Sequence, residues 1–128
     1  MPVKLTSFTT DAAPAAIGPY SQAVAAGDLV FVSGQIPLDP ATGQLVAGSF
    51  ASQAERVLAN LDAVLAAAGS GRDRVAKVTV FLTDLARFGE LNEIYARFFV
   101  GQLPARAVVQ VAGLPRGAEI EIEAVAVR

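Results

Sequence analysis

The sequence contains no histidine and no cysteine, and its only lysines are Lys4 and Lys77. Without histidine and cysteine, the usual zinc ligands, thiolate nucleophiles, His-based triads and disulfides are all excluded. We therefore expect no metal site. A chain without cysteine fits a reducing compartment, and the first ten residues lack the apolar core of a secretory signal. These absences predict a cytoplasmic protein.

Long apolar runs and blocks of basic residues are also missing. The longest apolar stretches are far shorter than the roughly 20 residues of a membrane-spanning helix, so no membrane association is expected. Ten Lys and Arg against twelve Asp and Glu leave a net charge of −2, which does not favour nucleic-acid binding. Neither GxGxxG nor GxxxxGK[ST] occurs, which removes the common nucleotide-phosphate motifs.

The sequence is rich in hydrophobic residues for a small chain. Its 128 residues suit one domain over residues 1–128, without a linker or a repeat. Hydrophobic residues make up 53% of the chain. Such a content often means that contact between subunits covers part of the apolar surface, so we expect an oligomer.

Hydrophobic periodicity and turn residues divide the chain into strands and helices. Gly27-Asp28 suits a two-residue hairpin turn between strands 20–26 and 29–35. Apolar residues recur every three or four positions from Phe50 to Ala68, which predicts a helix that Gly69 would cap. The other predicted elements are strand 75–83, a helix over 85–100 with Asp84 as N-cap, and strands 106–112 and 119–127.

This order of elements predicts an α+β fold in which two helices cover one face of a mixed sheet. Both faces of the sheet carry apolar side chains, so both need cover, and we expect other subunits on the face without helices. On strand 119–127, one face is expected to carry Ile120, Ile122, Ala124 and Ala126, and the other Val125 and Val127. On strand 75–83, one face is expected to carry Ala76, Val78, Val80 and Leu82, and the other Val75 and Phe81.

Arg106 is the first candidate functional residue, because it opens strand 106–112 rather than lying on a solvated helix face. A guanidinium held there could bind a carboxylate through two parallel hydrogen bonds. The alternative is a strand-end arginine that reaches solvent or pairs with a structural glutamate.

Glu121 is the second candidate, because it shares its strand face with Val125 and Val127. A partly buried carboxylate tends toward a raised pKa and could position or activate water. The alternative is an acid of an edge strand that discourages aggregation, as Glu119 and Glu123 would.

The distance between these two charges depends on strand order. A simple hairpin that pairs Ala112 with Glu119 places Gln110 opposite Glu121 and Val125 opposite Arg106. The two charges would then lie roughly 13 Å apart along the strands and form no ion pair. They would meet only with a different strand order or across a subunit boundary.

Four further residues are candidates for ligand contact. Asn92 lies at the margin of an apolar helix stripe, where a helix-to-loop hydrogen bond is the alternative role. Tyr20 and Ser33 stand at the ends of the first hairpin, with a core tyrosine and a strand-end hydroxyl as alternatives. Gly34 would let a ligand approach the backbone closely, although a β-bulge explains it equally well.

Several separated motifs together resemble one known family. These are APAAIGPYSQAV at 13–24, VFVSGQIPLDPATG at 30–43, PARAVVQVAGLP at 104–115 and IEIEAVAV at 120–127. NLDAVLAAAG at 60–69 and KVTVFLTDL at 77–85 add to them. From about residue 3 to the C-terminus, the sequence is similar to the RidA family of reactive intermediate deaminases.

This resemblance implies a chorismate-mutase-like fold and a homotrimer, with the sheets around a central barrel and three clefts between neighbouring subunits. It also implies the hydrolysis of 2-enamine and 2-imine acids, such as 2-aminoacrylate and 2-iminopropanoate, to 2-keto acids and ammonia, without a cofactor. The family's carboxylate-binding arginine falls on Arg106 and its acidic residue on Glu121. The other matched site residues are Tyr20 in GPY, Ser33 and Gly34 in SGQ, and Asn92.

Two departures and two other functions accompany the resemblance. Val108 stands where deaminating members often carry cysteine, and the segment VGQL at 100–103 is shorter than in typical members. A non-catalytic trimer that binds small carboxylates and regulates another protein would keep Arg106 and could dispense with Glu121. RNA cleavage or translation inhibition, ascribed to some relatives, is disfavoured by the net charge of −2 and the absence of histidine.

Overall fold

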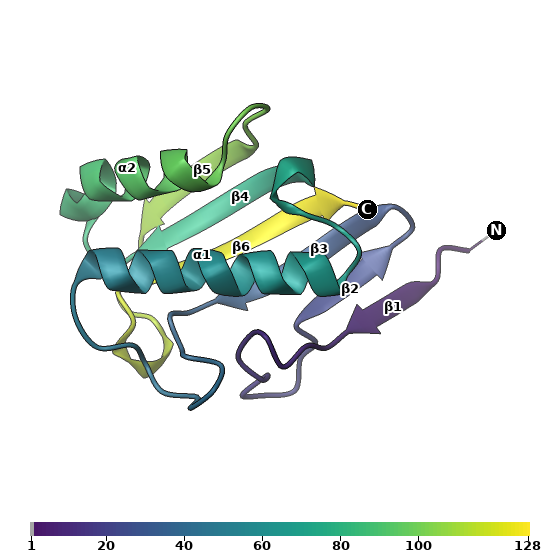
Figure 1. Cartoon of the computed structure of the whole chain (residues 1–128), viewed down its shortest axis with the longest axis horizontal. Coiled ribbons are helices and arrows are strands. Elements are labelled where there is room, and N and C mark those ends of the chain that lie inside the picture. Colours follow the sequence, from purple (N-terminus) through teal and green to yellow (C-terminus); the bar gives the residue numbers. More distant parts are fainter. Residues whose placement is uncertain (1) are drawn as a thin grey trace.

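The computed structural model describes residues 2–128 as a six-stranded mixed sheet with two α-helices on one face (Figure 1). The predicted α+β class and the placement of both helices on one face are confirmed. The strands are β1 (Leu5–Phe8), β2 (Ala23–Ala26), β3 (Leu29–Gln35), β4 (Val75–Leu82), β5 (Ala105–Gln110) and β6 (Ile120–Val127), and the helices are α1 (Phe50–Ala67) and α2 (Phe88–Phe98). Short 3₁₀ turns cover Arg72–Arg74, Leu85–Arg87 and Pro115–Gly117. Neither α-helix in this part of the chain is long and apolar enough to cross a membrane.

The strand order is β1-β2-β3-β6-β4-β5, with β4 and β5 parallel and the other pairs antiparallel. The simple hairpin considered for strands 106–112 and 119–127 is not formed, because β4 lies between β5 and β6. The connection between them passes the end of β4, where Val111 N–H donates to Leu82 O and Thr83 N–H donates to Glu119 O. Strand β6 is buried along its whole helix-facing side, which suits a central strand.

Strand β1 at the opposite edge was not predicted. It is four residues long and pairs with β2 from Leu5↔Ala26 to Phe8↔Ala23. Its two central residues, Thr6 and Ser7, are polar, and so short a segment has no readable periodicity. Pairing with β2, rather than local sequence, makes it a strand.

Helix α1 begins at Phe50, as predicted, and ends at Ala67, one residue before the predicted end, with Gly69 in the predicted position after it. The Ser49 hydroxyl accepts a hydrogen bond from Ser52 N–H at the N-terminus. At the C-terminus, Gly69 has φ +78°, Gly69 N–H donates to Ala66 O, and Ser70 N–H donates to Leu65 O. This is a Schellman motif, which glycine forms without steric cost because it has no Cβ.

Helix α2 begins three residues later than predicted. Asp84 is a cap, but its carboxylate accepts from Ala86 N–H and thus caps the 3₁₀ turn Leu85–Arg87. The α-helix follows at Phe88 and ends at Phe98. Its apolar stripe packs against α1 and the sheet through residues that include Leu91, Ile94 and Phe98.

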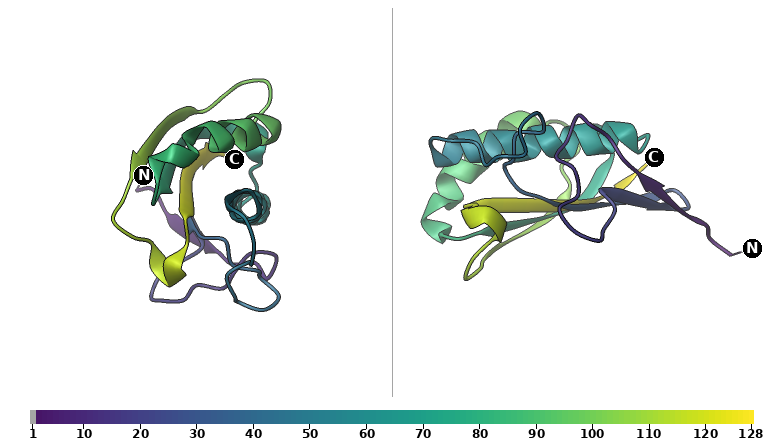
Figure 2. Two further views of the ribbon diagram at one scale, coloured as in Figure 1. Left: turned by 90° about the vertical axis from the view of Figure 1, so that its left-hand side faces the viewer. Right: turned by 90° about the horizontal axis from the view of Figure 1, so that it is seen from below.

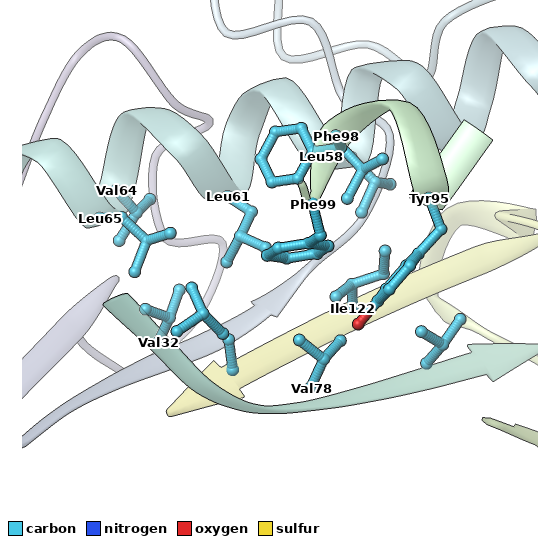
Figure 3. Close-up of a cluster of buried hydrophobic side chains, with 14 of the residues drawn as sticks. Val32, Leu58, Leu61, Val64, Leu65, Val78, Tyr95, Phe98, Phe99 and Ile122 are labelled. Carbon is cyan, nitrogen blue, oxygen red and sulfur yellow. The ribbon is translucent and has the colours of Figure 1, made fainter. Parts of the chain in front are cut away.

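The hydrophobic core lies between the two helices and the sheet, and Figure 3 shows part of it. Val78, Val80 and Leu82 of β4 face this core, as predicted. The prediction for the start of β4 is wrong: Val75 is buried and Ala76 is exposed. A register shift between Val75 and Lys77 opposite β6 inserts one extra residue and reverses the expected alternation there.

The other face of the sheet carries no helix (Figure 2). Large apolar side chains are exposed on it, including Leu29 at 42% and Phe31 at 45% of their full accessible area. Val127 of β6 is 39% exposed, next to Leu29 in the register. The second apolar face expected from the strand patterns is therefore present and uncovered in a single chain.

Candidate active site

Arg106 lies on the helix-facing side of the sheet, where it is opposite the buried Val78 of β4. Its Nη1 donates a hydrogen bond of 2.9 Å to Asn92 Oδ1 on α2. The guanidinium carbon lies 4.7 Å from the ring centre of Tyr95 and 5.5 Å from that of Phe88. Aromatic rings and one amide thus hold the guanidinium, which fixes its plane and leaves further N–H groups for an anion.

This guanidinium stands at the edge of a surface recess of about 560 Å³, which we call the Arg106 recess. None of the ion pairs within residues 2–128 includes Arg106. A half-buried cation without a carboxylate partner is a strong site for a carboxylate ligand. The recess is lined by Asn92, Tyr95, Ala96, Phe99, Val100, Gly101, Leu103, Pro104 and Arg106.

Glu121 lies on the opposite face of the sheet, where it is opposite Phe81 of β4. It lines a second depression of about 400 Å³, which we call the Glu121 hollow. The predicted residues Tyr20, Ser33 and Gly34 line the same hollow, so the structure brings these four residues together. The remaining lining residues are Ile17, Ile36, Pro115 and Glu123.

Gly34 lies directly beneath the Glu121 side chain. A Cβ added to Gly34 would overlap Glu121 Oε2 and would lie 2.8 Å from its Cδ. Gly34 also belongs to a register irregularity, because Val32 pairs with Ala124 but Gln35 pairs with Ile122. The alternative explanation for Gly34, a β-bulge, is present, and the group that approaches its backbone within this chain is the Glu121 side chain. The ligand contact of Gly34 stays a prediction.

Ser33 and Tyr20 hold the segment that closes the hollow. Ser33 Oγ donates a 2.6 Å hydrogen bond to Ser21 O, which ties β3 to the chain before β2. The Tyr20 hydroxyl accepts from Ile17 N–H at 3.3 Å, and the side chain is 47% exposed, so Tyr20 is not a core tyrosine. Both hydroxyl oxygens keep lone pairs that could accept a further hydrogen bond.

Burial raises the pKa of the Glu121 carboxyl, and the neighbouring carboxylate of Glu123 raises this pKa further. Both effects disfavour the charged form. None of the ion pairs within residues 2–128 includes Glu121. A half-buried acid of raised pKa, open to a hollow, suits proton exchange with water.

One chain therefore holds two separate half-sites. Arg106 is level with Val78 of β4 and Glu121 with Phe81, three residues apart, so their side chains leave the sheet on opposite faces. Asn92 joins Arg106 in the recess, whereas Tyr20, Ser33 and Gly34 join Glu121 in the hollow.

Comparisons with known proteins decide the family. The model of the Endoribonuclease L-PSP family matches residues 9–128. Protein DfrA of Myxococcus xanthus is 58% identical over 92% of both chains. The mouse 2-iminobutanoate/2-iminopropanoate deaminase is 53% identical over 94% of this chain and 90% of its own. Escherichia coli TdcF with bound serine has a TM-score of 0.91 and 45% identity, covering 96% of this chain and 98% of that one.

The chain belongs to the Rid family. This confirms the resemblance read from the motifs, and the fold is the chorismate-mutase-like α+β fold that it implied. The names in use differ in the activity that they state. The family is described as an endoribonuclease, the mouse relative is named a deaminase, and the name Protein DfrA states no activity.

The two departures expected from the Rid pattern lie in different places. Val108 pairs with Val80 of β4, on the same face as Arg106, and packs against the core rather than lining the Arg106 recess. The segment 100–103 contributes Val100, Gly101 and Leu103 to the lining of the recess. Of the two departures, only this segment forms part of the wall around the guanidinium.

Buried amides support this Rid family site and were missed in the sequence. Asn60 of α1 is fully buried, and its Nδ2 donates to Ile36 O at 3.2 Å and Leu38 O at 3.0 Å. Gln53 Oε1 accepts from Glu119 N–H at 2.9 Å, at the entrance to β6. Gln22 holds the segment before Ile17 by donating to Pro14 O at 2.8 Å. The sequence signal for such a buried amide is a polar amide residue on the apolar stripe of a helix, as at Asn60 between Val57 and Leu61.

No group of acidic residues in the described part of the chain is arranged to hold a metal ion. Glu121 and Glu123 supply two carboxylates from one strand face to the Glu121 hollow. The site is thus made of a guanidinium, amides, hydroxyls and carboxylates, a set that binds and orients a small polar organic molecule.

Proposed function

We propose that this protein hydrolyses 2-imino and 2-enamino acids, such as 2-iminopropanoate and 2-aminoacrylate, to 2-keto acids and ammonia. The observation that carries the proposal is the separation of the two half-sites: within residues 2–128 neither Arg106 nor Glu121 forms an ion pair, and the two lie on opposite faces of the sheet. Each supplies one of the two groups that the hydrolysis of an imino acid needs.

The proposal includes assembly. The exposed apolar sheet face, with Leu29, Phe31 and Val127, would be covered by further copies of the chain in a homotrimer. Each cleft would join the Arg106 recess of one copy to the Glu121 hollow of the next. We place the assembly in the cytoplasm, as the cysteine-free composition suggests.

In this cleft, the guanidinium of Arg106 binds the substrate carboxylate through its N–H groups, with Asn92 holding its plane. Glu121 accepts a proton from water as the water oxygen adds to the carbon of the protonated C=N bond. The adduct is a neutral carbinolamine, and returning the proton to its nitrogen gives an NH₃⁺ group, which is a good leaving group. Ammonia then departs with the electron pair of the C–N bond, the hydroxyl proton passes to Glu121, and the C=O bond forms.

Positioning accounts for much of the expected acceleration, because water and imine are held at one place and such imines already hydrolyse in water. The reaction consumes one water for each ammonia released, so no redox partner is required. RNA is a poor alternative substrate here, because the Glu121 hollow carries two carboxylates and the chain has a net charge of −2.

A coupled assay tests the proposal. A dehydratase produces 2-aminoacrylate from serine, and the rate of imine disappearance is followed with and without the purified assembly. We expect acceleration by the protein, and we expect Arg106→Gln to reduce kcat/KM by about 10²-fold or more because the carboxylate clamp is lost. Arg97→Gln removes an equally charged, exposed α2 residue and is the matched control.

Two outcomes would contradict the proposal. No acceleration of any imine derived from several amino acids would reject deaminase activity, and retained activity in Arg106→Gln would reject the carboxylate clamp. If the protein is inactive but binds pyruvate through Arg106, the alternative function of a carboxylate-binding regulator is supported instead. That alternative has its own basis, because the Arg106 recess is complete within one chain.

A further inference from the structure

Glu121 shares its hollow with a second carboxylate whose role neither the sequence motifs nor the family comparison assigns. Glu123 lines the same hollow and lies two residues further along β6. Residues two apart on a strand point to the same side and are about 7 Å apart. The two carboxylates are therefore neighbours that open into one space.

We propose that Glu123 is a positioning residue of the deaminase site, which acts through Glu121 by like-charge repulsion and makes Glu121 a stronger proton acceptor for the attacking water. This inference rests on the proposed deaminase function. Glu123 need not touch the substrate. Its negative charge favours the step in which Glu121 takes up a proton, and it leaves the atoms and electrons of the reaction unchanged.

Among the groups around the Glu121 hollow, Glu123 is the carboxylate positioned to repel the charge of Glu121. The Glu121 side chain lies against the backbone of Gly34, so it has little room to move away from Glu123. Opposite the pair on β4 stand Phe81 and Thr79, which carry no charge. The other titratable or charged groups on the surrounding elements are Tyr20 in the hollow, Lys77 further along β4, Arg116 next to Pro115, and Glu119 before β6.

The direction of the effect follows from the charges. The burial of Glu121 and the negative charge of Glu123 both raise the pKa of Glu121, which makes its ionised form a better base. The rate of a reaction that needs ionised Glu121 falls as the pH drops through this pKa. Removing the charge of Glu123 lowers the pKa of Glu121, so the acidic limb of the rate profile moves to lower pH. In the proposed trimer, the positive charge of Arg106 from the next copy lowers the pKa of Glu121 by the same amount in the unsubstituted protein and in Glu123→Gln. It therefore does not contribute to the difference between the two.

The test compares Glu123→Gln with Glu119→Gln in the intact assembly. Both substitutions remove one negative charge two residues from Glu121, but Glu119 does not line the hollow. Two quantities are measured: the carboxyl ¹³C NMR titration of Glu121, assigned with Glu121→Gln, and the pH profile of kcat/KM for an imine supplied in excess by an amino-acid oxidase.

For Glu123→Gln, we expect the titration of Glu121 and the acidic limb of kcat/KM to move together to lower pH. We also expect kcat at neutral pH to fall about two- to five-fold, because the weaker base transfers a proton less readily. KM should stay unchanged, since Arg106 binds the carboxylate. Glu119→Gln should match the unsubstituted protein in the Glu121 titration, the acidic limb, kcat and KM.

The inference is overturned if the Glu121 titration does not move in Glu123→Gln, or if it moves while the acidic limb stays in place. Equal shifts in both variants would also overturn it, because a general change of surface charge would then explain them. An inactive unsubstituted protein is a different result: it rejects the proposed function itself, and with it any catalytic role for Glu123.

Discussion

Arg106 and Glu121 lie on opposite faces of the same sheet, level with Val78 and Phe81 of the strand β4 that separates their own strands. A single small substrate cannot contact both side chains of one chain, because the sheet stands between them. If both act on one substrate, as proposed, the site must combine side chains of two copies. On this proposal, activity requires oligomerisation.

Complementation between two inactive variants follows from this arrangement. Arg106→Gln and Glu121→Gln should each be inactive, but a 1:1 mixture that is unfolded and refolded together should recover about one quarter of the unsubstituted activity, because a cleft needs an intact residue from each neighbour. The rate of imine hydrolysis measures this recovery.

The control is a mixture of the same two proteins without refolding, in which subunits have not exchanged. It should stay inactive until the subunits redistribute. Recovery of no activity after verified subunit exchange would show that both residues act within one chain or that the cleft is not formed as proposed.

Gly34→Ala should displace Glu121, because the new Cβ would occupy the position of Oε2. We expect a loss of about ten-fold or more in kcat with the assembly intact, since a misplaced acid no longer meets the attacking water. Kinetics and size-exclusion chromatography measure the two effects. Gly89→Ala in α2 is the matched control, because nothing lies within 4 Å of its added Cβ.

Gly89→Ala should leave activity unchanged and raise the free energy of unfolding by up to about 1 kcal/mol, because alanine favours the helix. An equal loss of activity in both glycine variants would show that the effect at Gly34 does not come from its contact with Glu121.

Asn60→Leu should destabilise the protein by about 2–4 kcal/mol, because the carbonyl oxygens of Ile36 and Leu38 both lose the Asn60 amide donor, and Leu38 N–H still donates to Ile36 O alone. Denaturant unfolding measures this change. Arg56→Leu is the comparison variant: it removes the 3.0 Å hydrogen bond from Arg56 Nε to Asn60 Oδ1 and should cost less, about 1 kcal/mol, because only this one oxygen loses a donor. Similar losses in both variants would contradict the role assigned to the Asn60 amide.

Tyr95→Phe should keep or raise stability, because the Tyr95 hydroxyl is buried without a hydrogen-bond partner among residues 2–128. Burial also raises the pKa of this hydroxyl, with Arg106 opposing the effect. Removing an unsatisfied buried hydroxyl should raise the free energy of unfolding by about 1 kcal/mol, while the ring still stacks on Arg106. A clear loss of stability would indicate a partner for this hydroxyl in the assembly.

Several parts of the fold were readable because their signals are local. Helix α1 has an apolar stripe and a Gly69 end within one segment, and the α+β class follows from the order of elements. Strand β1 and the start of β4 were not readable. The first depends on its partner β2, and the second on an extra residue opposite β6 that reverses the faces of Val75 and Ala76.

The candidate site divides in the same way. Strand position and motifs together proposed Arg106 and Glu121 as candidates, and the motifs added Tyr20, Gly34 and the other matched residues. The buried amides were missed, since their hydrogen bonds reach segments far away in the sequence. The role proposed for Glu123 was missed as well, because it depends on the hollow that Glu123 shares with Glu121.

The sequence by itself therefore determined the element types, the apolar character of both sheet faces and the identity of the polar residues that could act on a carboxylate. Only the tertiary structure decided where these residues lie. Placing β4 between β5 and β6 set Arg106 against the helices and Glu121 on the open face. Strand order is a long-range property, because it depends on the burial of whole strands rather than on neighbouring residues.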